Sequence, residues 1–334
     1  MSSSTLARPK SVWVLYGGNS SEREVSLRSG KGIVEALKSK GFIVNGFDVT
    51  PGPGFLNMDW RQPPDIVQLG LHGAFGEDGT VQGFLQTLGI PYVGSGVQSS
   101  AVSLHKSLAK HQMLSCGIEM PFSYDVFGEK GFLTLESLGT LPRDFYSSNW
   151  FIKPAREGST IGIERFRGES LEPQKARETF LSLLRKSETF DSHLLVEEWI
   201  DGPELTVPLL AGKALPIVEI RPLSKFYDFE SKYTKGKTEY LCPAPLSEED
   251  TNKCLRLAER AFAALECVDY GRVDIMLSKK GPKVLEMNTL PGMTETSLVP
   301  KSAAAAGMDY ATFLETLICL SYNRQTKNRP GGTR

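Results

Sequence analysis

The sequence is poor in the residues that usually build disulfide frameworks and metal clusters. It has five cysteines and four histidines among 334 residues. The cysteines are odd in number, widely spaced and without any Cys-x-x-Cys pair, which indicates thiols kept in a reducing compartment. The histidines are too scattered along the chain for a zinc motif, and no Ser-His-Asp set is recognisable. Disulfide-stabilised, zinc-dependent and serine-hydrolase functions are therefore not expected.

The sequence also lacks targeting and membrane signals. Its first ten residues contain no apolar stretch of the kind found in secretory signals, and no apolar run approaches membrane-spanning length. The net charge is only −1, so no surface for a polyanion is indicated. We expect a cytoplasmic protein with neither nucleic-acid nor membrane partners.

Short apolar runs alternate with helical patterns in the first third of the chain. A capping-box pattern at residues 21–24 opens a helix that ends near Gly41. This alternation predicts an open α/β sheet, in which ligands bind at the carboxyl ends of the strands. The predicted strands cover Val12–Tyr16, Phe42–Val49 and Ile66–Leu71.

The rest of the chain is predicted to form two further units. A helix over Gln98–Met113 precedes new strand patterns, and residues 222–245 form a long polar and aromatic segment suited to a mobile loop. The predicted division is an N-terminal α/β domain over 1–104, a central unit over 105–193, a C-terminal unit over 194–322 and a disordered tail over 323–334.

A hairpin between Gly271 and Gly292 carries the strongest chemical signal. Two apolar runs flank a Gly-Pro turn, and folding the chain about Lys280 sets Asp274 opposite Glu286 and Arg272 opposite Asn288. All four polar side chains then share one face, because side chains alternate along a strand. Two carboxylates about 5 Å apart repel each other, and oxygen donors of this kind suit Mg²⁺ or Mn²⁺.

The opposite face of this hairpin is predicted to be core. It carries Val273, Ile275, Leu285 and Met287. An alternative interpretation is an ordinary surface hairpin in which an ion pair with Arg272 neutralises one acid.

A second pattern resembles a phosphate-binding hairpin. Lys153 ends an apolar strand and is followed by a glycine-bearing loop up to Gly162. Such a loop lets backbone N–H groups approach phosphate oxygens, while the lysine supplies a positive charge. The Gly-Lys-Ser/Thr ending of a Walker A loop is absent. Because glycine-rich loops are common, a purely structural loop stays an alternative.

Acidic residues follow another predicted strand. Glu197 and Glu198 lie near the end of the run Leu194–Ile200, and Glu204 lies shortly after it. Their carboxylates could accept hydrogen bonds from a nucleotide base or ribose, or they could simply be solvated. Glu22 at a helix start could likewise be a plain cap, and His72 at the end of a strand could contact either substrate or backbone.

Taken in order, these parts resemble the ATP-grasp superfamily and, within it, the D-alanine–D-alanine ligase family. The resemblance runs from about Val12 to Ala311. The matching stretches are Gly17-Gly18-x-Ser20-x-Glu22-Arg23-Glu24-Val25-Ser26, Leu71-His72-Gly73-x-x-Gly76-Glu77-Asp78-Gly79, Gly94-Ser95-Gly96, Lys153-Pro154-x-Arg156-Glu157-Gly158-Ser159, Glu197-x-Trp199, Gly202-Pro203-Glu204, Lys232-Tyr233, Cys242-Pro243-Ala244, Gly271-Arg272-Val273-Asp274 and Glu286-Met287-Asn288-Thr289-x-Pro291-Gly292-Met293-Thr294.

The resemblance implies a two-subdomain ATP-grasp fold after the N-terminal domain, and a site for ATP and two Mg²⁺ or Mn²⁺ ions. Lys106 and Lys153 would hold the phosphates. Glu197 and the backbone of Glu198 and Trp199 would contact adenine, and Glu204 would contact the ribose. The expected metal ligands are Asp274, Glu286 and Asn288.

The resemblance also implies how two D-alanine molecules would bind. Glu22, with His72 nearby, would hold the ammonium of the first, and Ser297 with the Leu298 N–H would hold the carboxylate of the second. Arg272 and the Gly292 N–H would stabilise an oxyanion. The residues expected to link and order a closing loop are Ser159, Lys232 and Tyr233.

The expected activity is ATP-dependent joining of two D-alanines for peptidoglycan synthesis, in a homodimer. Two rivals are a D-alanine–D-lactate ligase, against which the resemblance sets Tyr233, and a nucleotide-binding regulator without activity. A regulator would be expected to lose a metal ligand or Lys153, and the chain keeps both. The chain departs from the family pattern at Ala155 and Thr160, which lie in the phosphate loop, and at Glu295 and Thr296, near the second-substrate site.

Overall fold

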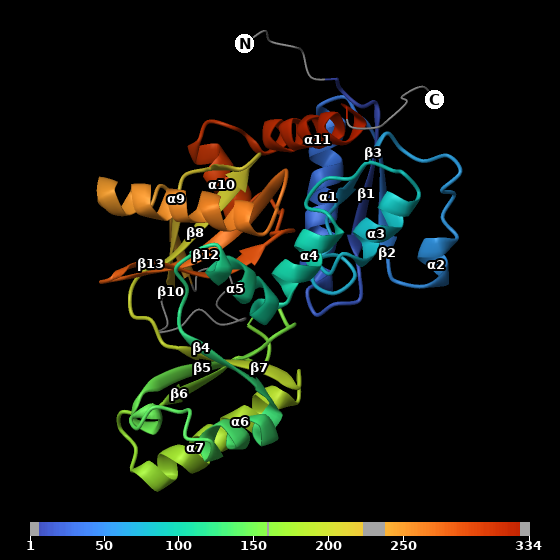
Figure 1. The fold of residues 1–334 in the computed structure, drawn as a ribbon. Helices are drawn as coiled ribbons and strands as arrows, with labels where there is room; N and C mark the ends of the chain where they lie inside the picture. The colour runs from blue at the N-terminus through green and yellow to red at the C-terminus, as the bar shows by residue number, and fades with distance from the viewer. Residues whose placement is uncertain (1–6, 159, 223–237, 328–334) are drawn as a thin grey trace.

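The computed structural model describes residues 7–158, 160–222 and 238–327. Within these ranges the chain forms three sheets, and Figure 1 shows them as an N-terminal unit mainly in blue, a central unit in green to yellow-green, and a C-terminal unit in yellow to red. Each sheet has its own buried apolar cluster, so the chain is mixed α/β with three separate cores.

The N-terminal sheet is parallel and has the strand order β2-β1-β3. The central strand β1 is completely buried at Val12, Val14 and Leu15, which explains its continuous apolar sequence. The predicted capping box does not form, because Glu22 occupies the N-cap position without a side-chain capping hydrogen bond. The elements are β1 (Ser11–Gly17), α1 (Arg23–Ser39), β2 (Ile43–Val49), α2 (Pro53–Leu56), β3 (Ile66–Leu69) and α3 (Thr80–Thr87).

The helix predicted over Gln98–Met113 is two helices. α4 (Val97–Leu104) ends at His105, whose backbone is extended, and α5 (Lys106–Ser115) begins at the next residue. The His105 side chain caps α5 by accepting a hydrogen bond from the Leu108 N–H, at 3.4 Å. The break makes Lys106 the first residue of a new helix.

The central sheet is antiparallel with the order β4-β7-β5-β6. The predicted strand, loop, strand pattern around Lys153 is confirmed by β5 and β6. β7 is an inner strand that pairs with both β4 and β5, so the boundary expected at residue 193 would separate it from the sheet to which it belongs; the division into domains stays a prediction. The elements are β4 (Ser123–Phe127), α6 (Gly128–Ser137), the 3₁₀ helix η1 (Phe145–Ser147), β5 (Asn149–Pro154), β6 (Glu164–Arg167), α7 (Pro173–Glu188) and β7 (His193–Glu198).

The C-terminal sheet has the order β11-β10-β8-β12-β13, and the short β9 pairs with β8. Residues 238–241 form the edge strand β11, so the segment expected to be a loop over 222–245 contains regular structure at its end. The elements are β8 (Glu204–Leu210), β9 (Lys213–Ala214), β10 (Val218–Pro222), β11 (Thr238–Leu241), α9 (Glu248–Ala264), β12 (Tyr270–Ser278), β13 (Gly281–Asn288), α10 (Leu298–Ala305) and α11 (Tyr310–Lys327).

The hairpin of β12 and β13 has the predicted pairs, Arg272 with Asn288 and Asp274 with Glu286, but it contains a β-bulge. The register shifts after Asp274, so that Ile275 pairs with Val284 and Leu285 becomes the extra residue. Val284 is completely buried, whereas Leu285 is only half-buried. The prediction that Leu285 faces the core was wrong, because a strict alternation of side chains in the sequence does not reveal an inserted residue.

The tail predicted to be disordered from residue 323 begins inside α11. The buried Asn323 hydrogen-bonds both to the backbone of Ala7 and to the Cys319 carbonyl. Arg324 forms a bidentate ion pair with Asp269, at 2.8 and 2.7 Å, and only 3% of the Asp269 side chain is exposed. α11 therefore joins the start of β12 to the N-terminal domain, and Figure 1 shows it lying against α1.

No single helix among the described residues is long and apolar enough to cross a membrane, although α10 and α11 pass by length and composition as a pair bent by 99°. In the fold, α11 buries Phe313, Leu314, Leu317 and Ile318 completely in the N-terminal core.

Replacing Arg324 with methionine should destabilise the protein by about 1–3 kcal/mol, because the buried Asp269 carboxylate loses its charged partner. A matched control is Arg185→Met, which removes an equally bidentate but exposed partner of Glu129. The control should change the free energy of unfolding by less than about 1 kcal/mol. Urea unfolding followed by circular dichroism measures both. Equal effects would show that α11 does not depend on this ion pair.

The bulge leads us to predict how two alanine substitutions change the free energy of unfolding. Val284→Ala should cost about 2 kcal/mol, since it empties space in a close-packed core. Leu285→Ala removes more atoms but should cost less, because its side chain is half-exposed. A regular hairpin would give the opposite order. The same unfolding measurement decides between them, and a larger loss from Leu285→Ala would contradict the bulged register.

Candidate active site

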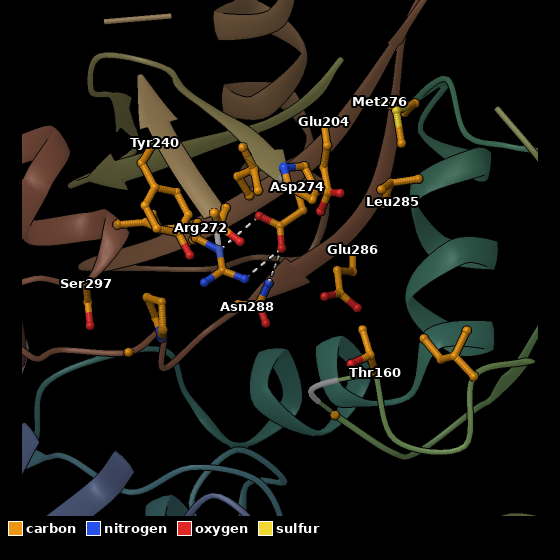
Figure 2. Close-up of a pocket in the computed structure, with 18 of the residues that line it drawn as sticks. Thr160, Glu204, Tyr240, Arg272, Asp274, Met276, Leu285, Glu286, Asn288 and Ser297 are labelled. Atoms are coloured by element: carbon orange, nitrogen blue, oxygen red, sulfur yellow. Dashed lines mark hydrogen bonds and ion pairs between the residues drawn. The ribbon is translucent and has the colours of Figure 1, made fainter. Parts of the chain in front are cut away.

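One cavity of about 1150 Å³ lies where the three sheets meet, and Figure 2 shows part of its wall. Its lining comes from the start of α1, the end of β3, strands β5 and β7, the C-terminal sheet and the start of α10. Every predicted site residue that the structure describes lies on this wall. They are Glu22, His72, Lys106, Lys153, Glu197, Glu198, Trp199, Glu204, Arg272, Asp274, Glu286, Asn288, Gly292, Ser297 and Leu298.

The predicted hairpin forms one wall, and its charged side chains contact one another (Figure 2). The Arg272 guanidinium donates to both oxygens of Asp274, at 2.9 and 2.7 Å. Thr206 on the neighbouring β8 and the Asn288 amide also donate to this carboxylate, at 2.5 and 3.1 Å. The ion pair considered as an alternative is therefore present. It is not a surface ion pair, however, because Asp274 is 7% exposed.

The same wall fits an oxygen-bound divalent cation. Glu286 pairs across the strands with Asp274, and its Oε2 lies 3.9 Å from the Lys106 ammonium. The two carboxylates are thus held against two cationic side chains, Arg272 and Lys106, which already offset part of their repulsion. A hard cation suits the remaining donor set, two carboxylates and the Asn288 amide. Within the described residues, no group of three His, Cys, Asp or Glu side chains is arranged as a metal cluster.

Glu197 is the most enclosed acid of the cavity, with only 3% of its surface exposed. Lys153 donates to its Oε1, and Lys110 donates to its Oε2 at 2.9 Å. Burial alone would raise the pKa of Glu197, but the two lysine charges and their hydrogen bonds outweigh it and the pKa is lowered. Glu197 is therefore buried and paired with lysines, and it is not the solvated acid that was considered as an alternative.

Lys110 is a functional candidate that the sequence analysis missed. Only 4% of its side chain is exposed, and this burial lowers its pKa even though Glu197 favours the charged form. A usable signal was present, since Lys106 and Lys110 are four residues apart and therefore share one face of α5.

Glu198 turns its side chain toward the C-terminal sheet. It accepts hydrogen bonds from Lys283 on β13 and from the Phe122 N–H, the latter at 2.8 Å. The backbone N–H groups of Glu198 and Trp199 are also used, by the carbonyls of Phe122 and Asn149. Glu198 therefore joins two sheets at the back of the cavity.

An aromatic stack forms another part of the wall. Trp199 and Phe151 lie nearly parallel, with ring centroids 4.7 Å apart and an interplanar angle of 11°. Both rings line the cavity, as does Glu204 at the start of β8. This side of the cavity is thus flat and apolar with one acid at its edge.

The N-terminal domain contributes Glu22 and His72. The His72 ring is buried, its Nδ1 lies 3.1 Å from the Leu290 carbonyl, and its Nε2 has no hydrogen-bond partner. Burial alone would lower the pKa of His72, but the nearby carboxylates of Glu77 and Glu22 raise it. Since buried polar atoms are rarely left unpaired, the orphaned Nε2 indicates a place for a ligand. The two alternatives for His72, a contact with substrate and a contact with backbone, are compatible, because only its Nδ1 contacts the backbone.

The start of α10 closes the opposite side. Ser297 is its N-cap residue but makes no side-chain capping bond to the helix; its hydroxyl contacts the Thr294 N–H at 3.0 Å and the Thr294 hydroxyl at 2.7 Å. Tyr310 donates to the Met293 carbonyl at 2.6 Å and so fixes the chain next to Gly292. The N-terminus of α10 therefore lies at the cavity wall, directly after a turn whose backbone Tyr310 holds.

Three predicted site residues, Ser159, Lys232 and Tyr233, lie outside the described residues. Both described neighbours of the 223–237 segment, Pro222 and Thr238, line the cavity.

The histidines are less scattered in space than in sequence. His111 and His193 each place Nε2 about 3 Å from Asp125, and the ring of His105 lies 5.1 Å from that of His193. Among the described residues, no group of three His, Cys, Asp or Glu side chains here could hold a metal ion.

Comparisons with known proteins agree on one family. The family model for the C-terminus of D-ala D-ala ligase matches residues 146–319, and the model for its N-terminus matches residues 52–95. A D-alanine–D-alanine ligase of Methylacidiphilum infernorum is 43% identical over 320 residues, covering 95% of this chain and 97% of the relative. One from Bordetella pertussis is 44% identical over 307 residues, covering 90% and 91%.

Solved structures give the same result. The D-alanine–D-alanine ligase of Bacillus anthracis has a TM-score of 0.79 at 31% identity, covering 96% of this chain and 99% of that one. The same enzyme complexed with ATP has a TM-score of 0.78 at 30% identity, with coverage of 97% and 100%. A D-Ala:D-Ser ligase, VanG of Enterococcus faecalis, has a TM-score of 0.75 at 28% identity, with coverage of 94% and 100%. The cavity thus lies in a fold shared with these ligases along almost its whole length, and the chain belongs to the D-alanine–D-alanine ligase family.

Proposed function

We propose that this chain uses ATP to join two D-alanine molecules through an acyl-phosphate intermediate, supplying D-alanyl-D-alanine for peptidoglycan. Members of its family are ATP-dependent ligases that form a carbon–nitrogen bond. One observation carries the assignment to this cavity. A single enclosed space brings a cluster of lysines and metal-type carboxylates together with the orphaned His72 Nε2 and the N-terminus of α10.

ATP is proposed to lie between the central and C-terminal sheets. The Trp199–Phe151 side offers a flat apolar wall for the base, with Glu197 as acceptor for the adenine amino group and Glu204 for the ribose. Because the N–H groups of Glu198 and Trp199 are already paired, a backbone contact from these residues must come through a carbonyl. Lys106 and Lys153 supply positive charge for the phosphates.

Asp274, Glu286 and Asn288 would hold Mg²⁺. Bound there, the ions would neutralise the phosphate oxygens and favour attack on the terminal phosphorus. Cation binding would also compete with Arg272 for Asp274, since one carboxylate cannot fully serve both. Arg272 would then be available to stabilise developing negative charge.

The chemistry proceeds in two transfers. A carboxylate oxygen of the first D-alanine attacks the γ-phosphorus, the bond to ADP breaks, and an acyl phosphate forms. The neutral amine of the second D-alanine attacks that carbonyl, loses a proton, and phosphate leaves with the bridging oxygen. Arg272 and the Gly292 N–H stabilise the tetrahedral oxyanion between these events. Glu22 and His72 position the first substrate, and Ser297 with the Leu298 N–H positions the second substrate's carboxylate.

The remaining expectations are part of the same proposal. Ser159, Lys232 and Tyr233 would order the site and exclude water, which would otherwise hydrolyse an acyl phosphate. Homodimer formation and a cytoplasmic location stay predictions.

Because the fold is also shared with a D-Ala:D-Ser ligase, the identity of the second substrate needs a direct test. Phosphate release with D-alanine, L-alanine, D-serine and D-lactate should be greatest with D-alanine alone, and activity that requires D-serine or D-lactate would overturn the substrate assignment.

Glu286→Gln should lower kcat by about a hundredfold or more, because a metal at the phosphates contributes several kcal/mol to catalysis and the amide carries no charge. The fold should survive, since the other face of β13 is unchanged core. Glu178→Gln, an exposed change on α7, is the matched control and should leave kcat unaltered. Retention of most of the activity by Glu286→Gln at saturating Mg²⁺ would rule out Glu286 as a metal ligand.

Isotope transfer tests the acyl phosphate. With both carboxylate oxygens of D-alanine labelled by ¹⁸O, the phosphate released should contain one labelled oxygen, because the bridging oxygen leaves with phosphorus. Mass spectrometry of the phosphate measures it, and hydrolysis of ATP without D-alanine is the blank. Unlabelled phosphate accompanied by dipeptide formation would exclude this route.

A further inference from the structure

Three charged groups form a buried cluster behind the proposed adenine site. Glu197 lies between Lys153, with 14% of its side chain exposed, and Lys110, with 4% exposed. Lys153 and Glu197 line the cavity, whereas Lys110 reaches the carboxylate from the packed side of α5. The cluster therefore has two cations for one acid, and only one of these cations is at the cavity wall.

The two lysines are expected to respond differently to a bound phosphate. Lys153 ends β5 beside the glycine loop, so a phosphate in the cavity would draw its ammonium away from Glu197. If Lys153 were the sole partner, Glu197 would then be a nearly inaccessible carboxylate without a counter-charge. Such a group takes up a proton. The protonated acid would offer its O–H as a donor, whereas an adenine amino group needs an acceptor.

We infer that Lys110 is a positioning residue that keeps Glu197 ionised and fixed when Lys153 moves to the phosphates, and that it thereby sets the preference for adenine. The inference rests on the proposed function, because it takes ATP as the ligand of this cavity. An ionised carboxylate accepts from the amino group of adenine and repels the carbonyl oxygen that guanine carries at the same position. The selection of ATP over GTP thus depends on a residue that does not touch either nucleotide.

Loss of Lys110 should also make nucleotide affinity depend on pH. In the wild type, Glu197 retains Lys110 and stays ionised, so nucleotide affinity should change little between pH 6 and pH 8. Without Lys110, burial raises the pKa of Glu197, and ATP binding should weaken as pH falls through that raised value. Neighbouring charged groups that face the cluster are Lys153 from β5 and Asp125 from β4. Both are retained in the variant, but Lys153 turns to the phosphates when ATP binds, so Glu197 is then left without a cationic partner.

The test measures the Kd of ATP and of GTP by calorimetry on the full chain, with KM for D-alanine alongside. Lys110→Met, which keeps the shape but removes the charge, should raise the Kd of ATP about tenfold at pH 6 and less at pH 8. It should lower the ATP-to-GTP preference by a similar factor and leave KM for D-alanine unchanged. Lys110→Arg should restore the preference and the flat pH profile. Lys110→Gln, neutral but polar, is the second variant if the methionine form does not fold.

A double variant separates positioning from mere packing. If Lys110 acts through Glu197, then adding Lys110→Met to Glu197→Gln should leave the nucleotide preference and pH profile of Glu197→Gln unchanged. An equal loss of ATP affinity at every pH, with the ATP-to-GTP ratio unaltered, would show a structural role and overturn the inference. So would a neutral variant that behaves like the wild type. Failure of the wild type to bind ATP would refute the proposed function instead.

Discussion

Charge neutralisation in a partly enclosed space is the constraint on which the rest of this structure depends. The cavity gathers acids from five strands, and a buried carboxylate without a partner is costly. Each of its most enclosed acids is accordingly paired: Asp274 with Arg272 and Glu197 with two lysines. A phosphate can attract the partners that line the cavity, Arg272 and Lys153, and a divalent ion can replace a cationic side chain beside its carboxylate. The ligand-free arrangement is therefore a set of ion pairs ready to be exchanged.

The scaffold around these pairs limits how far the exchange can spread. Glu198 and Lys283 connect the central and C-terminal sheets directly behind the cavity. Next to them, a Cβ atom at Gly202 would lie 2.0 Å from the Leu277 carbonyl, so the link from β7 to β8 passes β12 too closely for any side chain. The Arg324–Asp269 pair holds α11 and the N-terminal domain to the start of β12. The cations can move while the walls that carry them stay in register.

Much of this arrangement could be predicted from the sequence. The hairpin pairing of Asp274 with Glu286 follows from alternation and one turn signal, and the ordered motifs brought distant residues to one site. What failed were features decided by tertiary contacts. The break at His105, the edge strand at 238–241 and the ordered Arg324 each depend on partners far away in sequence. Lys110 was missed although its spacing from Lys106 on α5 is visible in the sequence, because Glu197, the partner that gives it a role, lies on another element.

The bulge on β13 determines which length changes the hairpin can tolerate during evolution. Leu285 is the one residue without a cross-strand partner between the pairs Asp274–Glu286 and Ile275–Val284. Loss of Leu285 would simply join the two halves into a regular ladder, with Val284 still in the core and Glu286 still in the cavity. Loss of Met287, by contrast, would set Glu286 opposite Val273 and send an acid into the apolar layer. Homologous chains of this family can therefore differ by one residue at this position of β13, and the lost side chain would come only from the cavity wall.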